Sequence, residues 1–181
     1  MPRERTQLRY QLYRSMARKQ ASSSIALLQH QLEREKRAVI DLSKVRFEPI
    51  DTLAVNASLR WEIPQFCWRE VMAWKAREPL SLDFSIWFEE ELCGLCFANP
   101  NNSRRRIRIV RLEGRSGEAH PLKNRIGTLA LIVIEQYARI IGSEVLEVQE
   151  PLVGAISHYQ ELGFRFDVEG RLVKNVGNRV S

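Results

Sequence analysis

A basic turn in front of a long apolar helix is the part of the sequence with the clearest chemical meaning. Residues 123–128 read Lys-Asn-Arg-Ile-Gly-Thr, and the apolar run that follows predicts a buried helix ending at Gly142. The first N–H groups of a helix have no partner within it, so this end attracts anions. We therefore expect a phosphate-binding loop with basic side chains and a glycine that lets the ligand approach the backbone, formed by Lys123, Asn124, Arg125, Ile126, Gly127 and Thr128.

A tyrosine further along the chain is a candidate proton donor. Residues 155–164 read Ala-Ile-Ser-His-Tyr-Gln-Glu-Leu-Gly-Phe, which predicts a short helix ended by Gly163. A tyrosine hydroxyl has an ordinary pKa of about 10, so it stays protonated at neutral pH and can donate a proton. Tyr159 is our candidate for this role. The alternative is that Tyr159 packs against the following strand.

The order of basic turn, apolar helix, strand and tyrosine-bearing helix resembles the GNAT superfamily of N-acetyltransferases over roughly residues 45–176. The family pattern Ala-x-x-x-Tyr-x-x-x-Gly-Phe is matched by Ala155, Tyr159, Gly163 and Phe164. Residues 125–127 match the end of the family's pyrophosphate loop. The loop departs from the family pattern at its first and fourth positions, where Leu122 and Arg125 stand.

The resemblance implies that acetyl-coenzyme A is the cosubstrate and that an amine attacks its thioester directly. Its pyrophosphate would bind residues 123–128, and backbone N–H groups of a splayed strand, here ending at Leu112, would hold the acetyl carbonyl. Tyr159 would protonate the departing thiolate. The amine must also lose a proton, and Glu113 is our candidate general base among three residues that otherwise read as solvated loop positions, namely Glu113, Glu118 and His120.

The elements expected to position these residues form an α/β (α+β) domain over residues 44–181, with a GNAT-like mixed, mostly antiparallel central sheet flanked by helices. Strands are predicted at residues 45–50, 82–88, 91–98, 104–112, 143–149, 163–168 and 171–176. Helical segments are predicted at residues 51–77, with an interruption near Pro64, at 129–141 and at 152–162.

The acceptor would contact the region between the first two strands and one face of the fourth strand. In GNAT enzymes the helices after the first strand form a wall of the acceptor site, so we expect Trp61 and Trp68 to bind substrate; the alternative is that both belong to the core. Arg106 and Arg108 alternate with isoleucines, which predicts one cationic sheet face. Arg108 then either contacts the acceptor or lies on a solvated face.

The basic charge of the protein is concentrated at its N-terminus. Residues 1–37 hold nine basic and three acidic side chains, which accounts for the whole net charge of +6. Residues 1–43 therefore read as a basic helical extension. We predict two helical segments separated at residues 21–24, with apolar stripes formed by Leu8, Leu12 and Met16 and by Ile25, Leu28 and Leu32.

These stripes predict a packing face that docks on the same domain or on a second copy, so a homodimer is expected. A nucleic-acid contact is the less favoured alternative, because aromatic side chains for stacking are limited to Tyr10 and Tyr13.

Composition and cysteine usage indicate a cytoplasmic protein. The chain has 181 residues, 44% of them hydrophobic, with no apolar run of the roughly 18 residues needed to cross a membrane, and its first residues lack the apolar core of a secretion signal. Three cysteines do not make a disulfide framework. Cys93 and Cys96 lie in a predicted strand, where residues three apart point to opposite faces, so we expect buried thiols and no metal site.

The leading hypothesis is an N-acetyltransferase that acts on a primary amine of a small molecule, peptide or protein. One alternative is a binding or regulatory module on a degenerate GNAT fold, suggested by the altered loop. Another is an acetyltransferase for an RNA-bound acceptor such as aminoacyl-tRNA, whose binding would require residues 1–37 and weaken steeply with salt.

Overall fold

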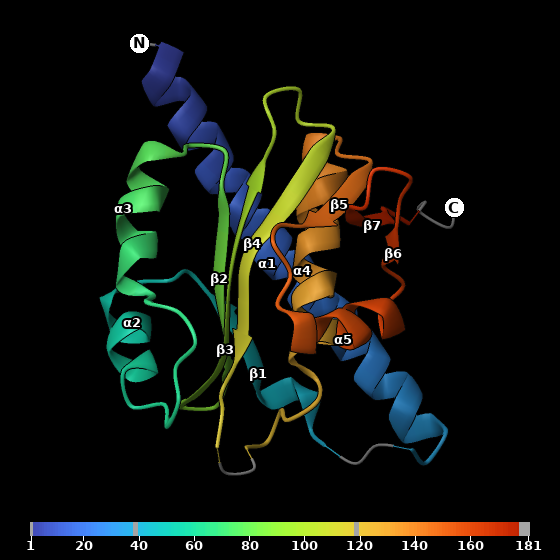
Figure 1. Ribbon diagram of the computed structural model, residues 1–181. Coiled ribbons are helices and arrows are strands. Elements are labelled where there is room, and N and C mark those ends of the chain that lie inside the picture. Colours follow the sequence, from blue (N-terminus) through green and yellow to red (C-terminus); the bar gives the residue numbers. More distant parts are fainter. Residues whose placement is uncertain (1, 38–39, 118–119, 178–181) are drawn as a thin grey trace.

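The computed structural model describes residues 2–37, 40–117 and 120–177. Within them the strands form one seven-stranded sheet of order β1-β2-β3-β4-β5-β7-β6, in which β4 and β5 are parallel and all other neighbours are antiparallel (Figure 1). The strands are β1 (Val45–Glu48), β2 (Leu82–Phe88), β3 (Glu91–Pro100), β4 (Arg106–Gly114), β5 (Val145–Val148), β6 (Arg165–Phe166) and β7 (Leu172–Asn175). The expected mixed, mostly antiparallel sheet is confirmed.

Helices cover both faces of this sheet (Figure 1). On one face α1 (Pro2–Arg34) packs against α4 (Ile126–Ile141), and their buried side chains form one core with those of the strands. On the other face α2 (Thr52–Ser58) and α3 (Arg69–Arg77) cover a second core that contains Trp61, Trp68 and Trp87. The remaining elements are α5 (Ile156–Glu161) and the 3₁₀ helices η1 (Leu42–Lys44) and η2 (Val153–Ala155).

Several element boundaries follow from local chemistry that the sequence displays. Asp51 caps α2 by accepting a hydrogen bond from the Ala54 N–H at 2.9 Å. Gly142 ends α4 in the left-handed region, at φ 82°. The strand predicted to end at residue 98 continues through Pro100, so the loop that follows it begins later than expected.

The N-terminal helix differs from the prediction in two ways. It is a single α-helix, in which the Ser23 and Ser24 hydroxyls donate to carbonyls one turn back in the same helix. The expected stripe of Leu8, Leu12 and Met16 also points to solvent. The buried face lies opposite and consists of Tyr10, Ala17, Ala21 and Ile25.

We expect Ile25→Val to lower the free energy of unfolding by about 1 kcal/mol, because it removes a methylene from a residue that is 2% exposed in the shared core. The matched control is Leu27→Ala, which deletes more atoms from a side chain that is 74% exposed and should change stability by less than about 0.5 kcal/mol. Urea unfolding measures both. Equal effects of the two substitutions would contradict the packing of α1 into the core.

The two cysteines of β3 share one side of the sheet, which contradicts the expectation of opposite faces. Ile86 pairs with Gly94 and Trp87 with Leu92, so Cys93 is an extra residue in a β-bulge that shifts the alternation by one. Cys93 and Cys96 are therefore both buried in the core beneath α1 and α4. Burial raises the pKa of Cys93 to about 11 and also raises the pKa of Cys96.

The described residues show neither a metal-binding cluster nor a membrane-spanning helix. They contain no cluster of three or more histidine, cysteine, aspartate or glutamate side chains arranged to hold a metal ion. None of the helices in the described parts of the chain has the length and hydrophobicity to span a membrane.

Candidate active site

The parallel strands β4 and β5 separate halfway along β4 and leave an opening in the sheet. They pair only over Arg106–Ile109 and Val145–Val148, and the last hydrogen bond runs from the Gln149 N–H to the Ile109 carbonyl at 3.0 Å. The chain then turns away at Glu150, which has φ 46°. The opening holds a small cavity of about 60 Å³, whose walls include Val110, Leu112, Pro151, Leu152 and Tyr159.

A second β-bulge orients the backbone at this opening. Ala98 pairs with Ile109 and Phe97 with Arg111, so Val110 is the extra residue. Beyond it, the Arg115 N–H donates to the Cys93 carbonyl of β3. Because donors alternate along an antiparallel strand, the N–H of Leu112 points away from β3 toward the opening. This orientation suits the carbonyl-binding role predicted for Leu112.

Tyr159 reaches the opening from α5. Its ring lies edge-on to Phe164, with centroids 5.5 Å apart, and the residue is 8% exposed. Its hydroxyl makes no hydrogen bond with any residue that the structure describes. Burial, and to a lesser degree the nearby Cys96, raise the pKa of Tyr159 above its ordinary value. The hydroxyl therefore stays protonated at neutral pH and is free to donate.

The predicted phosphate loop lines a larger cavity of about 410 Å³ at the N-terminus of α4. Five of its six residues contribute to the lining, namely Lys123, Asn124, Ile126, Gly127 and Thr128. The exception is Arg125, which occupies the N-cap position of α4 without a side-chain capping bond. His158, Glu161 and Leu162 of α5 form the opposite wall.

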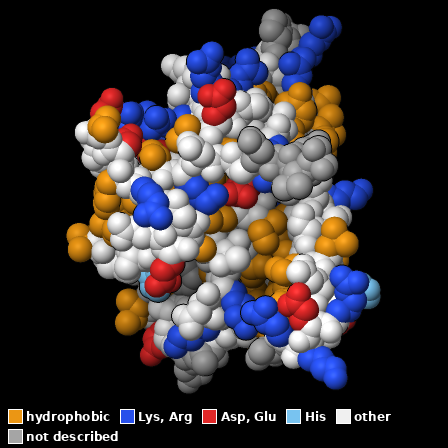
Figure 2. Space-filling model, turned by 90° about the vertical axis from the view of Figure 1, so that its right-hand side faces the viewer, with side chains coloured by type: hydrophobic (Ala, Val, Ile, Leu, Met, Phe, Trp, Pro, Cys, Tyr) orange, Lys and Arg blue, Asp and Glu red, His pale blue; other side chains and the backbone are white. Residues whose placement is uncertain are grey.

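This cavity suits a pyrophosphate. The first N–H groups of α4 have no intrahelical acceptors, and its first turn carries no acidic residue. Lys123 places positive charge on the cavity wall, whereas Arg115, which also lines the cavity, is paired with Glu91. The face of the molecule that includes α5 presents Lys and Arg side chains around exposed hydrophobic ones (Figure 2). Residues of this chain that would hold coenzyme A are therefore present.

Glu113 does not point freely into a cavity. Its side chain is buried, and its carboxylate accepts hydrogen bonds from the N–H groups of Gln65 and Phe66 and from the indole N–H of Trp68. These three donors occupy most of the accepting positions of the carboxylate. These contacts favour an anchoring role for Glu113 over the general-base role suggested by the sequence.

His120, another candidate base, is not at the opening. His120 lines the α4 cavity, where its Nδ1 accepts from the Leu122 N–H and burial lowers the pKa of the imidazole. Glu118 lies outside the described residues.

The residues predicted to bind the acceptor are dispersed. Trp68 is 2% exposed and its indole is bound to Glu113, so it belongs to the core. Arg108 lies on the exposed face of β4, 3.4 Å from Glu147, and Arg106 pairs with the same carboxylate at 2.6 Å. The expected cationic sheet face is thus partly neutralised by Glu147.

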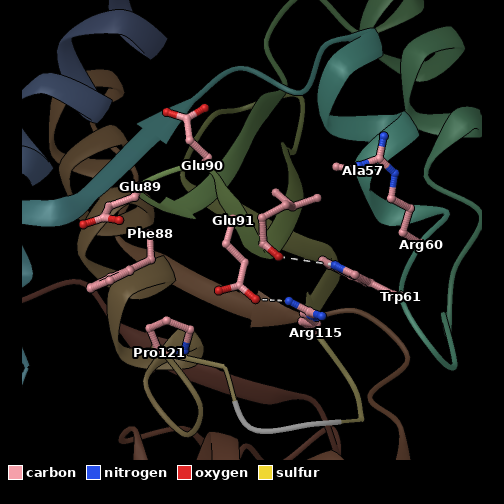
Figure 3. Close-up of a pocket in the computed structure, with 10 residues that line it drawn as sticks. Ala57, Arg60, Trp61, Phe88, Glu89, Glu90, Glu91, Arg115 and Pro121 are labelled. Atoms are coloured by element: carbon pink, nitrogen blue, oxygen red, sulfur yellow. Dashed lines mark hydrogen bonds and ion pairs between the residues drawn. The ribbon is translucent and has the colours of Figure 1, made fainter.

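Trp61 lines a separate cavity of about 530 Å³ beside the β2–β3 hairpin (Figure 3). Its indole donates to the Leu92 carbonyl at 3.3 Å, which fixes the ring in the wall. Glu91 and Arg115 form an ion pair in the middle of this cavity, and Arg115 also lines the α4 cavity. Trp61 does not line the opening that holds Tyr159.

The opening is covered on the α3 side by residues that the predicted site did not include. Gln65 and Phe66, in the loop between α2 and α3, line the same cavity as Tyr159. Arg111 stacks on the rings of Phe66 and Trp74, 5.1 and 4.4 Å from their centroids. The density of aromatic residues at positions 61–74 was the only available signal of this loop.

A mixed sheet whose parallel pair opens beside a helix N-terminus defines the fold of the GNAT acetyltransferases. No family model and no curated protein matches the sequence. Solved structures do match, among them an acetyltransferase of the GNAT family from Staphylococcus aureus Mu50, with 10% identity, a TM-score of 0.56 and coverage of 74% of this chain and 99% of that one. The aminoglycoside 6'-N-acetyltransferase from Enterococcus faecium matches with 15% identity, a TM-score of 0.55 and coverage of 75% and 99%.

An aminoglycoside 6'-N-acetyltransferase complexed with coenzyme A matches with 14% identity, a TM-score of 0.53 and coverage of 75% of this chain and 99% of that one. At such low sequence identities, the structural similarity establishes the fold alone. The chain has the GNAT fold, and the resemblance predicted from its sequence is confirmed at that level.

Proposed function

We propose that the protein is an N-acetyltransferase that transfers the acetyl group of acetyl-coenzyme A to a primary amine by direct attack. The observation that carries the proposal is Tyr159, a buried tyrosine whose hydroxyl has no partner among the described residues and which lines the opening between β4 and β5. The cavity at the N-terminus of α4 supports the same function, because it suits the pyrophosphate of the cosubstrate.

In the proposed mechanism the first N–H groups of α4 and Lys123 hold the pyrophosphate, and the thioester lies in the opening. The amine nitrogen attacks the carbonyl carbon, and the N–H of Leu112 stabilises the negative charge that develops on the carbonyl oxygen. The carbon–sulfur bond then breaks. Tyr159 donates its proton to the leaving sulfur, and the proton lost by the amine passes to water. Water then returns a proton to the Tyr159 oxygen and restores the tyrosine.

A noncatalytic binding module is the second candidate, and one contact favours it. A Cβ atom on residue 127 would lie 2.9 Å from Cδ1 of Leu162, so the glycine is already explained by the packing of α5 on α4. The presence of Gly127 is therefore not in itself evidence that the cavity binds a ligand. Binding of acetyl-coenzyme A separates the two candidates.

Thermal unfolding with acetyl-coenzyme A is the direct test. At about 100 times its dissociation constant a ligand adds roughly 2.7 kcal/mol, which for a chain of this size raises the Tm by roughly 5–10 °C. The acetyl thioester of N-acetylcysteamine, which lacks the pyrophosphate, is the matched ligand and should produce a much smaller shift. Absence of a shift with acetyl-coenzyme A would contradict the proposal.

Turnover is then measured as release of free thiol with a panel of primary amines comprising spermidine, kanamycin and a peptide with a free N-terminus. We expect at least one of these amines to accelerate thiol release. Binding of acetyl-coenzyme A without turnover of any amine would favour the binding module.

A further inference from the structure

The loop between α2 and α3 is held against the end of β4 by a buried carboxylate. Glu113, 4% exposed, accepts from the Gln65 N–H at 2.7 Å, from the Phe66 N–H at 3.3 Å and from the Trp68 indole N–H at 2.8 Å. No basic side chain of the described residues forms an ion pair with it. The negative charge of Glu113 is thus stabilised by donors of the loop, and the loop donors are satisfied by Glu113.

A second charged side chain of β4 holds the same loop from the other side. Arg111 donates to the Cys67 carbonyl and to the Glu70 carboxylate, both at 2.9 Å, and its guanidinium stacks on Phe66. Residues 59–68 contain no long helix or strand, so these contacts replace the hydrogen bonds that regular structure would supply. Together, Glu113 and Arg111 bind four consecutive residues of the loop, 65–68.

The residues held in this way form one wall of the opening. Gln65 and Phe66 line the cavity that also contains Leu112 and Tyr159, while Pro151 and Leu152 line it from the β5 side. The Gln65 side chain is exposed and makes no hydrogen bond of its own within the described structure. The position of the loop backbone therefore sets the width of the opening and the direction in which Gln65 points.

We propose that Glu113 is a positioning residue that fixes Gln65 and Phe66 at the mouth of the opening, and that these two residues determine which primary amines reach the thioester. This inference rests on the proposed acetyltransferase function. It replaces the role of Glu113 as proton acceptor, because the carboxylate is buried and already accepts three hydrogen bonds from the loop.

Glu113→Gln tests the proposal, because it sets an amide N–H₂ group against the N–H donors of the loop. We expect KM for the fastest amine of the panel to rise roughly 10- to 100-fold, the range for losing a hydrogen bond to a buried charge. The dissociation constant of acetyl-coenzyme A should stay within about twofold of the wild-type value, because the phosphate-binding end of α4 is untouched. Trp68→Phe removes one donor only, and we expect a smaller increase in the same KM.

Asp83→Asn is the matched control. Asp83 is also a buried strand carboxylate that accepts from a backbone N–H, that of Ile50 at 2.8 Å, but it pairs with Lys75 and does not line the opening. The Asp83→Asn substitution should lower the free energy of unfolding and leave KM for the amine unchanged. Hydrogen exchange of the Gln65 and Phe66 amides can be measured without an amine substrate. It should be faster in Glu113→Gln than in the wild type, and unchanged in Asp83→Asn.

Two results would overturn the inference. One is an unchanged KM for the amine in both Glu113→Gln and Trp68→Phe. The other is a loss of kcat of roughly 10²- to 10⁴-fold in Glu113→Gln together with loss of the acidic limb of the pH–rate profile, which is the behaviour of a general base. Failure of the wild-type protein to bind acetyl-coenzyme A would instead contradict the proposed function itself.

Discussion

Tyr159→Phe is expected to lower kcat by roughly 10²- to 10⁴-fold, the usual contribution of a general acid, with little change in the affinity for acetyl-coenzyme A. The substitution removes only the hydroxyl, and the ring keeps its edge-on contact with Phe164. Since the hydroxyl has no hydrogen bond to any described residue, its loss should cost little stability. Thiol release at saturating substrate measures the effect.

Tyr137→Phe is the matched control for this prediction. Tyr137 is fully buried and burial also raises its pKa, but its hydroxyl donates to the Leu80 carbonyl at 2.6 Å. Its removal should cost about 1 kcal/mol of stability and leave kcat unchanged. A Tyr159→Phe protein with wild-type kcat would remove Tyr159 from the mechanism.

Gly127→Arg should weaken the binding of acetyl-coenzyme A by roughly 100-fold or more, which corresponds to the loss of two charge-assisted hydrogen bonds of about 1.5 kcal/mol each. Its side chain would start against Leu162 and extend into the cavity of about 410 Å³ at the N-terminus of α4. The rise in Tm that acetyl-coenzyme A produces in the wild type should then be lost.

The control is Gly127→Ala, whose methyl group meets only the flexible end of Leu162. We expect this variant to keep most of the rise in Tm. If Gly127→Arg retained the full rise, the cofactor would bind elsewhere, and the cavity beside the β2–β3 hairpin would be the next site to test.

Elements whose boundaries are determined by residues close together in the chain were predicted well from the sequence. The β2–β3 hairpin, the end of α4 at Gly142 and the short helix that carries Tyr159 each depend on residues that are close in the chain. Five residues of the predicted phosphate loop also line one cavity, while their binding of phosphate stays a prediction. Acetyl-coenzyme A, the amine acceptor, the homodimer and the roles of the site residues stay predictions.

The errors have a common physical cause in contacts between distant parts of the chain. The serines at positions 22–24 suggested a break in the first helix, but the packing of Ala17 and Ala21 in a core shared with α4 favours a continuous one. The bulge at Cys93 arises from the pairing of β3 with β2 and leaves no mark in the sequence.

Glu113 illustrates the same limit at the site. Its position after a strand suggested a free base, whereas the three donors that bind it come from residues 65–68 of a separate loop. Only the tertiary structure brings that loop to the end of β4, so sequence spacing could not indicate the contact.

The packing of α1 on α4 also has a consequence for synthesis of the protein. The ribosome makes α1 before α4, and α4, which packs on the apolar face of α1, begins only at Ile126. At the usual elongation rates the intervening chain takes on the order of 5–20 s to appear. During that interval Tyr10, Ala17, Ala21 and Ile25 have no partner from α4, so this part of the core cannot form until the second half of the domain has been synthesised.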